Sequence, residues 1–426
     1  MSHELTILYR KNFFLSMVTL VILGGLVFSV GFHFVYFPAI GQTSYPYSTF
    51  LGLESLRFSD FYDTCDRSLI NNPYRTWTLY FPATFLFFRP LCSLTKMNIG
   101  YLKLLFIFFS AFNFSLFFII SIKLLNLKKW NIFKWAIISA CCYPMLYAWN
   151  RGNIEPLTLS LVASSYYLSY KKLYRCSGVA LAMTSAMKGT PGVFGSRYFL
   201  QGNHRSFLFM ILSVFTFTFL GLVIIGGDPV EQLNGLIAQH IVFESVWADG
   251  LDGLVRSTSL YGMYKIPLLI LDFNIKNANS IAMFFWALTL VIFLGISIFI
   301  IRTIKPQSTA FVFLSSAIFF LFLPKVTNDY KTIILLLFPV LLSEKEWAFF
   351  GALNSFLFGI IFIPKNFIIL NFESLHRYDA NLHQSYSDIT IGAILTPLVI
   401  IFLFVRFSYF IKQSEKQYVR FRKQTI

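Results

Sequence analysis

The sequence predicts an all-α polytopic membrane protein with about twelve transmembrane helices and with interfacial helices in its first outer loop. Of its 426 residues, 56% are hydrophobic, 52 are phenylalanine and only 13% are charged. A soluble globular domain contains about 25% charged residues. Apolar stretches that approach the roughly 20 residues needed to cross a bilayer recur along the chain. The composition and the recurring apolar stretches therefore both indicate a bilayer environment.

The net charge predicts the orientation of the chain. Its 35 Lys and Arg residues outnumber 19 Asp and Glu residues, which gives a charge of +16. Basic residues collect in the short cytoplasmic loops of membrane proteins, and no basic stripe with interleaved aromatic residues stands outside the apolar segments. The charge therefore indicates an integral membrane protein with both termini in the cytoplasm, and it argues against a nucleic-acid partner.

The chain is expected to begin with a span, a long outer loop and a second crossing. Arg10 and Lys11 precede a long apolar stretch without a small-residue cleavage site, so we expect a retained first span at 13–36 and not a removed signal peptide. The stretch 78–94 is apolar but is interrupted by two prolines and an arginine, which favours an interfacial or re-entrant helix. Residues 101–122 then cross inward to a lysine-rich loop.

The remaining apolar stretches are separated by basic or turn-forming groups. Loops rich in Lys and Arg follow the stretches that return to the cytoplasm, and polar turns such as "NRGNIEP" and "PKVTNDYK" follow those that go outward. The expected helices are 135–149, 157–170, a short pair at 177–188 and 191–200, and then 207–225, 281–301, 309–323, 332–342, 347–363 and 391–407.

A single transmembrane domain over residues 1–426 is the expected unit, because no Pro-, Gly- or Ser-rich linker and no internal repeat divides the chain. Outer loops at 37–100, 226–280 and 364–390 are expected to form the active-site side. They hold most of the carboxylates, and ionisable groups near the membrane are candidates for function.

The five cysteines are Cys65, Cys92, Cys141, Cys142 and Cys176. They show no CxxC spacing and no Cys/His cluster, so a structural metal site is not expected. Cys65 and Cys92 both fall on the outer side and are able to pair, but we expect them to be unpaired small apolar residues.

The stretch "FSDFYDTCDR", residues 58–67, places three acids shortly after the first span. If Ser59 caps a helix, Asp60, Asp63 and Asp66 are spaced by three and share one broad face. A carboxylate held at the membrane rim can act as a general base towards a hydroxyl group. The same spacing also suits a solubilising helix face, and the spacing alone leaves both interpretations open.

Two cations are expected at the outer ends of short helices. Arg151 lies in "NRGNIEP" and Lys188 in "AMKGTP". Arginine presents a planar fork and lysine a point charge, and the two together suit a phosphate group. Snorkelling to lipid headgroups is the alternative for each cation alone. Because Gly152 and Gly189 allow close backbone approach beside them, we favour a phosphate pocket.

These motifs resemble the core of glycosyltransferase family 87. Its members show Arg-Gly-Gln/Asn, an apolar helix, basic residues, a small-residue-rich helix and Lys-x-x-Pro, which here are Arg151–Asn153 and Lys188–Pro191. "NNPY", "LYFP", "STSLYG" at 257–262 and "LPKVTNDY" resemble further stretches of the family. Two positions depart from the pattern, because Ala83 stands where a second proline is usual and Ser257 replaces the usual Asn.

The resemblance implies the membrane-embedded C-type glycosyltransferase fold and an inverting transfer without a covalent intermediate. In such enzymes an aspartate of the first outer loop is the general base, which points to Asp60, with Asp63 in reserve, while Arg151 and Lys188 hold the donor phosphate. Other implied substrate contacts are Tyr62, Asp63, Asn153, Arg256, Tyr261, Lys325, Asn328, Asp329 and Tyr330. No cofactor is needed in this scheme, although some relatives in the wider superfamily use a divalent metal.

The implied partners are a polyprenyl-phosphate-sugar donor, a glycolipid or polysaccharide acceptor, and membrane lipids. The implied location is the bacterial inner membrane, with the active site on the periplasmic side. An O-antigen polymerase or ligase and a non-enzymatic lipid-glycan flippase are the alternatives. The long, acid-led first outer loop argues against the former, and the lack of paired repeats in the sequence argues against the latter.

Overall fold

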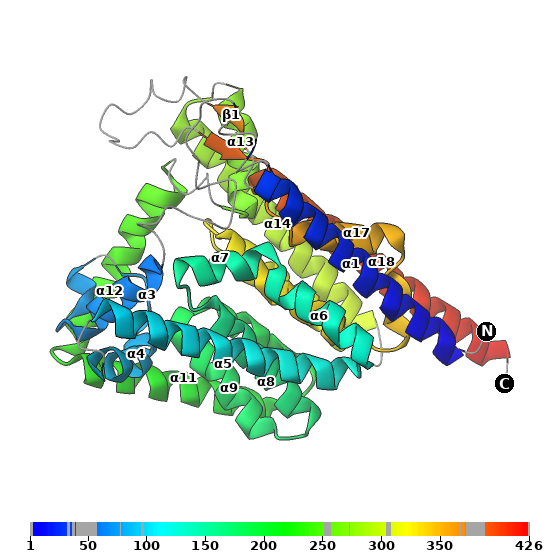
Figure 1. Cartoon of the computed structure of the whole chain (residues 1–426), viewed down its shortest axis with the longest axis horizontal. Coiled ribbons are helices and arrows are strands. Elements are labelled where there is room, and N and C mark those ends of the chain that lie inside the picture. The colour runs from blue at the N-terminus through cyan, green and yellow to red at the C-terminus, as the bar shows by residue number, and fades with distance from the viewer. Residues whose placement is uncertain are drawn as a thin grey trace. The chain divides into compact units, whose positions relative to one another are not determined.

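A computed structural model describes residues 3–31, 35, 39, 58–76, 78–94, 98–250, 257–271, 273–303, 308–365, 368–371 and 388–424. Most of these residues are helical (Figure 1). The chain forms two compact units, each assembled from separate segments of the sequence. Unit 1 comprises Met1–Thr49, Leu125–Pro144 and Gly250–Ile426, and unit 2 comprises Phe50–Leu124 and Met145–Asp249. The single transmembrane domain stays a prediction.

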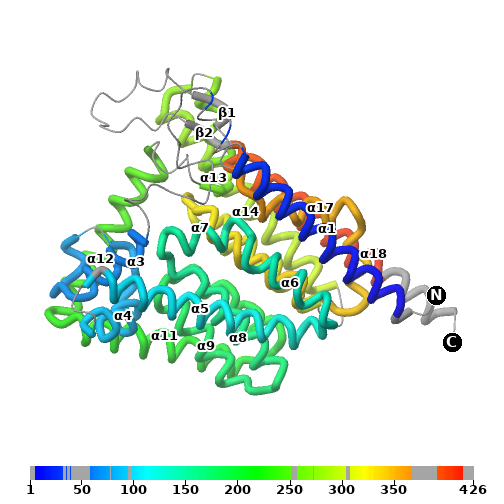
Figure 2. The backbone as a smooth tube through the Cα atoms, viewed as in Figure 1, coloured from blue at the N-terminus to red at the C-terminus, as the bar shows by residue number. Residues whose placement is uncertain are grey.

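Unit 2 is built from helices that join the first outer loop to the middle of the chain. Its elements are α3 (Ser59–Leu69), η3 (Pro73–Arg75), α4 (Pro82–Leu94), α5 (Ile99–Leu125), α7 (Tyr143–Arg151), α8 (Glu155–Tyr170), α9 (Tyr174–Lys188), η4 (Thr190–Gly195), α10 (Ser196–Leu200), α11 (His204–Ile225), α12 (Pro229–Phe243) and the π-turn Glu244–Ala248. Helix α9 packs against α8 and α11 (Figure 2), and Ser160 Oγ on α8 donates to Asn113 Oδ1 on α5 at 3.0 Å.

Local sequence signals explain where two of these helices begin. The Asn203 side chain accepts a hydrogen bond from the Ser206 N–H at the start of α11, and Asp228 accepts one from the Val230 N–H at the start of α12. Such caps satisfy backbone donors that have no partner within the helix. Pro229 follows its cap directly, at the position where a missing N–H costs nothing.

A buried arginine ties three helices of unit 2 together. Arg197 on α10 is only 1% exposed, and its Nη2 donates to Ser165 Oγ on α8 at 2.6 Å and to Ser177 Oγ on α9 at 2.9 Å. Its guanidinium lies 3.7 Å from the centre of the Tyr166 ring. Hydroxyl groups and an aromatic face thus surround the charge, an arrangement that the sequence pattern did not reveal.

Unit 1 contains both ends of the chain. Its elements are α1 (His3–Gly31), α6 (Lys129–Cys141), α13 (Leu260–Ile270), α14 (Ile275–Thr303), α15 (Thr309–Phe322), η6 (Asp329–Leu336), α16 (Leu337–Val340), η7 (Lys345–Phe349), α17 (Ala352–Ile361), β1 (Ile368–Asn371), β2 (Asp388–Thr390) and α18 (Gly392–Gln424). The start of α1 and the end of α18 lie at the same end of this unit (Figure 1).

Aromatic packing forms the core of unit 1. The Phe14 ring on α1 lies 5.5 Å from the Trp347 ring and 4.2 Å from the Phe350 ring, and the Phe338 ring lies 4.9 Å from the Phe407 ring on α18. Offset and edge-to-face contacts of this kind add to the stabilisation from burial. The small antiparallel pair β1 and β2, with Asn371 opposite Asp388, departs from the all-α prediction.

Five described helices are long and apolar enough to cross a membrane, which supports the prediction of a polytopic membrane protein. They are Leu5–Gly31, Gly100–Leu125, His204–Ile225, Ile275–Thr303 and Gly392–Glu415, and α6 with α7 makes a sixth if that bent pair is one span. The count of about twelve spans stays a prediction.

Several expected helices are broken in the structure, including 191–200, which is divided between η4 and α10, and 347–363, which is divided between η7 and α17. The stretch 135–149 divides at Cys142 into α6 and α7, because Pro144 has no N–H to continue the hydrogen-bond ladder. The stretch 332–342 is mainly the 3₁₀ turns of η6, followed by the short α16.

Candidate active site

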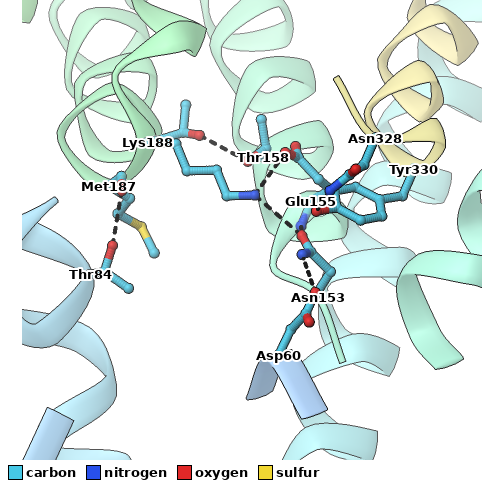
Figure 3. Close-up of polar contacts among 10 residues, drawn as sticks. Asp60, Thr84, Asn153, Glu155, Thr158, Met187, Lys188, Asn328 and Tyr330 are labelled. Atoms are coloured by element: carbon cyan, nitrogen blue, oxygen red, sulfur yellow. Dashed lines mark hydrogen bonds and ion pairs between the residues drawn. The ribbon is translucent and has the colours of Figure 1, made fainter. Parts of the chain in front are cut away.

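Five charged or polar side chains of unit 2 form one continuous chain of hydrogen bonds. Arg151 Nη2 donates to Asp60 Oδ1 at 2.7 Å, and Asn153 Nδ2 donates to Asp60 Oδ2 at 2.7 Å. Lys188 Nζ donates to Asn153 Oδ1 at 3.2 Å and to Glu155 Oε1 at 2.8 Å. Asn153 therefore links an aspartate to a lysine (Figure 3). Two cations and two carboxylates give this network no net formal charge.

Asp60 is placed by the unusual start of α3. Phe58, with φ 57°, precedes the helix, and its N–H donates to the Asn150 carbonyl at 2.8 Å. Ser59 does not cap this helix, because it is the first helical residue and no side chain caps the N-terminus. Asp60 lies in the first turn, where the partial positive charge of the helix N-terminus favours a carboxylate.

Gly152 makes the turn between α7 and α8 compatible with α3. Its φ is +72°, and a Cβ there would lie 2.9 Å from both Phe58 Cα and Phe61 Cβ. A side chain is therefore excluded both by the backbone conformation and by the space. Arg151 ends α7, Gly152 turns the chain, and Asn153 reaches Asp60. The Arg-Gly-Asn motif thus has a distinct role at each position.

Lys188 is placed by the end of α9 and by the segment that enters α4. Phe81 N–H donates to the Met187 carbonyl at 3.1 Å, and Thr84 Oγ1 donates to the same carbonyl at 3.0 Å (Figure 3). The Phe81 ring lies 3.1 Å from the position that a Cβ of Gly189 would occupy, and Gly189 has φ +72°. The residues around Pro82 therefore dock directly on the turn after Lys188.

The aromatic ring of Tyr80 lies beside the Lys188 ammonium group. Its ring centre lies 5.7 Å from Lys188 Nζ. Burial and, to a lesser extent, the negative charge of Asp60 raise the pKa of Tyr80 above its ordinary value. Its hydroxyl therefore stays protonated at neutral pH and remains a hydrogen-bond donor.

The two carboxylates of the network differ in access. The Asp60 side chain is 16% exposed, whereas that of Glu155 is 1% exposed. A hydroxyl group of a substrate can therefore approach Asp60 but not Glu155. Asp63 and Asp66 are exposed on α3, so the structure separates Asp60 from the other two acids of the triplet. Tyr62 packs on Phe58, with ring centres 6.4 Å apart.

The predicted substrate contacts in the later part of the chain gather in unit 1. Thr258 N–H donates to the Thr327 carbonyl at 2.7 Å, which joins the 257–262 stretch to the 324–330 stretch. Within these two stretches Lys325 Nζ lies 6.0 Å from the centre of the buried Tyr261 ring.

The rest of the second stretch is also ordered by local contacts. Asn328 Nδ2 donates to Tyr330 OH at 2.6 Å, and Asp329 is buried at the start of η6. Two motifs that are about 70 positions apart in sequence are thus neighbours within unit 1. Arg256 lies outside the described residues.

A disulfide bond joins Cys65 on α3 to Cys92 on α4, with 5.3 Å between the Cα atoms. The expectation of unpaired cysteines is therefore wrong. The physical reason is the packing of α3 on α4, where the Phe61 and Phe88 rings lie 5.8 Å apart. Sequence separation alone did not reveal this contact between helices.

Glu155 was not among the predicted site residues. Its only signal in the sequence is an isolated acid at the start of an apolar helix, where an ionisable group is costly unless it is paired. Among the described residues no group of three or more His, Cys, Asp or Glu side chains could hold a metal ion. The site thus combines an accessible carboxylate with two cations that can bind an anion.

Comparison with known protein families found a match that covers the middle of the chain. A sequence model of glycosyltransferase family 87 matches residues 77–324, which is more than half of the 426 residues. Arg151, Asn153, Glu155 and Lys188 lie within the matched range, and Asp60 precedes it. No curated protein and no solved structure matches the chain.

Proposed function

The chain belongs to glycosyltransferase family 87, and we propose that it is an inverting hexosyltransferase that uses a polyprenyl-phosphate-linked sugar. The acceptor is a lipid-linked or envelope glycan at the outer face of the bacterial inner membrane, and the fold is of the membrane-embedded C type. The observation that carries this proposal is the accessible Asp60 carboxylate, held by Arg151 and Asn153. The family match favours sugar transfer over the polymerase, ligase and flippase alternatives.

In the proposed reaction Asp60 is the general base. The acceptor hydroxyl oxygen attacks the anomeric carbon while its proton passes to a carboxylate oxygen of Asp60. Both Asp60 oxygens accept a hydrogen bond in the structure. Each carboxylate oxygen offers more than one lone pair, so these bonds orient the group without preventing proton uptake. A single displacement of this kind inverts the anomeric configuration.

Arg151 and Lys188 act on the leaving group. As the bond between the anomeric carbon and the phosphate oxygen breaks, its electron pair stays on the lipid phosphate. Cations placed where this negative charge develops stabilise the transition state. The ion pairs of Arg151 with Asp60 and of Lys188 with Glu155 support this role, because they hold both cations at one site. No step of this scheme requires a cofactor.

Two observations support the outer face as the side of reaction. Disulfides form in oxidising compartments such as the periplasm, and the Cys65–Cys92 disulfide belongs to α3, the helix that carries Asp60. The start of α1, with Arg10 and Lys11, and the end of α18 lie at one end of unit 1. Basic residues at the two ends of the chain favour cytoplasmic termini. Because α1 is long enough to cross the membrane, a cytoplasmic start of α1 favours an outer position for α3, which follows it and carries Asp60.

The residues gathered in unit 1 complete the proposal. Lys325, Asn328, Asp329 and Tyr330 are proposed contacts to the donor or its sugar, and Tyr261 and Arg256 to the acceptor. The backbone pairing of Ser257 with Asn328 supports a joint role for the two stretches.

The decisive experiment changes the charge of Asp60 while keeping its size. We expect Asp60→Asn to lower kcat for transfer from polyprenyl-phosphate hexoses by about 10²- to 10⁴-fold, which is the usual contribution of a general base. Transfer is measured in membranes or proteoliposomes that contain equal amounts of each variant. Asp66→Asn is the matched control, because it changes an exposed acid of the same helix. Full activity of Asp60→Asn at normal expression would refute the general-base role.

A further inference from the structure

Glu155 is a buried charge that the proposed chemistry does not consume. Its side chain is 1% exposed, and an ionised carboxylate in such a place is destabilising unless it is paired and hydrogen-bonded. It also cannot serve as the base, because an acceptor hydroxyl has no access to it. Its role therefore depends on the groups that it contacts.

Two polar contacts of Glu155 outside the hydrogen bonds of its own helix lead towards Asp60. Its Oε1 accepts from Lys188 Nζ at 2.8 Å, and its backbone N–H donates to Asn153 Oδ1 at 3.1 Å. Glu155 is the first residue of α8, where the helix dipole favours a negative charge. A rigid helix start thus presents both a carboxylate and an N–H group to the site.

These contacts fix the orientation of Asn153. Its Oδ1 accepts from Lys188 Nζ and from the Glu155 N–H. Because one side of the amide is occupied by donors, the Nδ2 side is directed at the acceptor Oδ2 of Asp60. The Glu155 N–H and the Lys188 ammonium together therefore determine which end of the Asn153 amide meets the base, and the Glu155 carboxylate acts on Asn153 through Lys188.

We infer that Glu155 is a positioning residue for the transfer reaction, which holds the Lys188 ammonium where the donor phosphate binds and keeps Asn153 turned towards Asp60. The inference rests on the proposed function. A lysine side chain has a flexible four-carbon stem and loses conformational entropy when it binds a ligand. A fixed partner orders the side chain beforehand, so less entropy is lost when the phosphate binds. An ammonium group has three N–H donors, so one lysine can contact a carboxylate and a phosphate oxygen together.

The test uses the Michaelis constant for the donor. We expect Glu155→Gln to raise the KM for a polyprenyl-phosphate hexose by about tenfold or more, and to leave the KM for the acceptor unchanged. KM does not depend on the fraction of enzyme that is folded, so a purely structural role would lower only the maximal rate. Glu155→Asp, which restores the charge, is expected to recover part of the donor affinity.

Two further variants make the test specific. Glu231→Gln is the matched control, because Glu231 forms an exposed ion pair with Arg75 in the same unit at 2.7 Å. In a Lys188→Ala background, Glu155→Gln is expected to change the donor KM by less than twofold, since the group that it positions is gone. This double variant leaves neither charge of the pair buried alone, which protects folding.

The outcomes separate the two proposals. If the wild type transfers sugar and Glu155→Gln keeps the wild-type donor KM, the positioning role is overturned and the proposed function stands. The same holds if Glu155→Gln raises the donor KM equally with and without Lys188. If the wild type uses no polyprenyl-phosphate hexose as donor, both proposals fail.

Discussion

At the scale of single residues, the Arg151-Gly152-Asn153 turn shows how adjacent positions divide the work of a site. The two polar side chains bind opposite oxygens of one carboxylate. Gly152 between them contributes no chemistry, but its missing side chain lets α3 lie against the turn. The hydrogen bonds that hold Asp60 therefore depend on a residue that has no side chain.

Gly152→Ala is expected to displace α3 and to lower kcat/KM by about 10²-fold, because a shift of about 1 Å at reacting groups costs this much. The new Cβ would lie 2.9 Å from Phe58 Cα, a backbone atom that cannot rotate away. Gly202→Ala is the control. Gly202 has φ +69° but nothing within 4 Å of its Cβ position, so it shares the backbone strain of about 1–2 kcal/mol without the clash. Equal activity of the two variants would contradict the argument.

The sequence predicted three charged residues of this hydrogen-bond network but not the ion pairs that they form. Asp60, Arg151 and Lys188 were predicted from their residue types and motifs, and the structure brings them together. It did not predict that each cation is paired with a carboxylate, because Asp60 and Arg151 are 91 positions apart and Glu155 and Lys188 are 33 apart. Only the packing of α3 against the turn before α8, and of α9 beside it, makes these pairs.

At the scale of elements, the α3–α4 pair holds the base in place. Phe61 on α3 lies 5.8 Å from the Phe88 ring on α4 and 5.1 Å from the Phe106 ring on α5. A helix in the 78–94 stretch was predicted, and α4 spans Pro82–Leu94. The disulfide that joins α4 to α3 was not predicted, because side-chain contacts between helices produce no repeating pattern in the sequence. For the same reason the sequence did not predict the contacts of Arg197 that join α8, α9 and α10.

Removing the Cys65–Cys92 disulfide is expected to weaken this pair. The bond closes a loop with a sequence separation of 27, and loss of such a crosslink costs about 3–4 kcal/mol in the chain-entropy treatment. Cys65→Ala with Cys92→Ala should therefore lower the unfolding temperature in detergent. Transfer activity should fall as well, because α3 carries Asp60. Cys176→Ser, which changes an exposed free cysteine, serves as the control. An unchanged unfolding temperature and activity in the double variant would rule out this role.

At the scale of the whole molecule, charge and hydropathy together predict how the chain lies in the membrane. The five long apolar helices were each predicted near their observed positions, since a span leaves a strong local signal. Shorter helices such as α8 and α9 were also predicted. Their length alone does not show whether they cross, because α8 has 16 residues and α9 has 15. Orientation depends instead on which loops are basic.

Cys176 offers a direct test of this orientation. It is an exposed free cysteine on the first turn of α9, next to Arg175, at a helix end that we expect on the cytoplasmic side. A membrane-impermeant maleimide should therefore label it only after the membrane is permeabilised, and Cys176→Ser should remove that signal. Thr76→Cys, at an exposed position of the first outer loop, should be labelled in intact cells. The reverse pattern would place Asp60 and the reaction on the cytoplasmic side, where the Cys65–Cys92 disulfide would not be expected to persist.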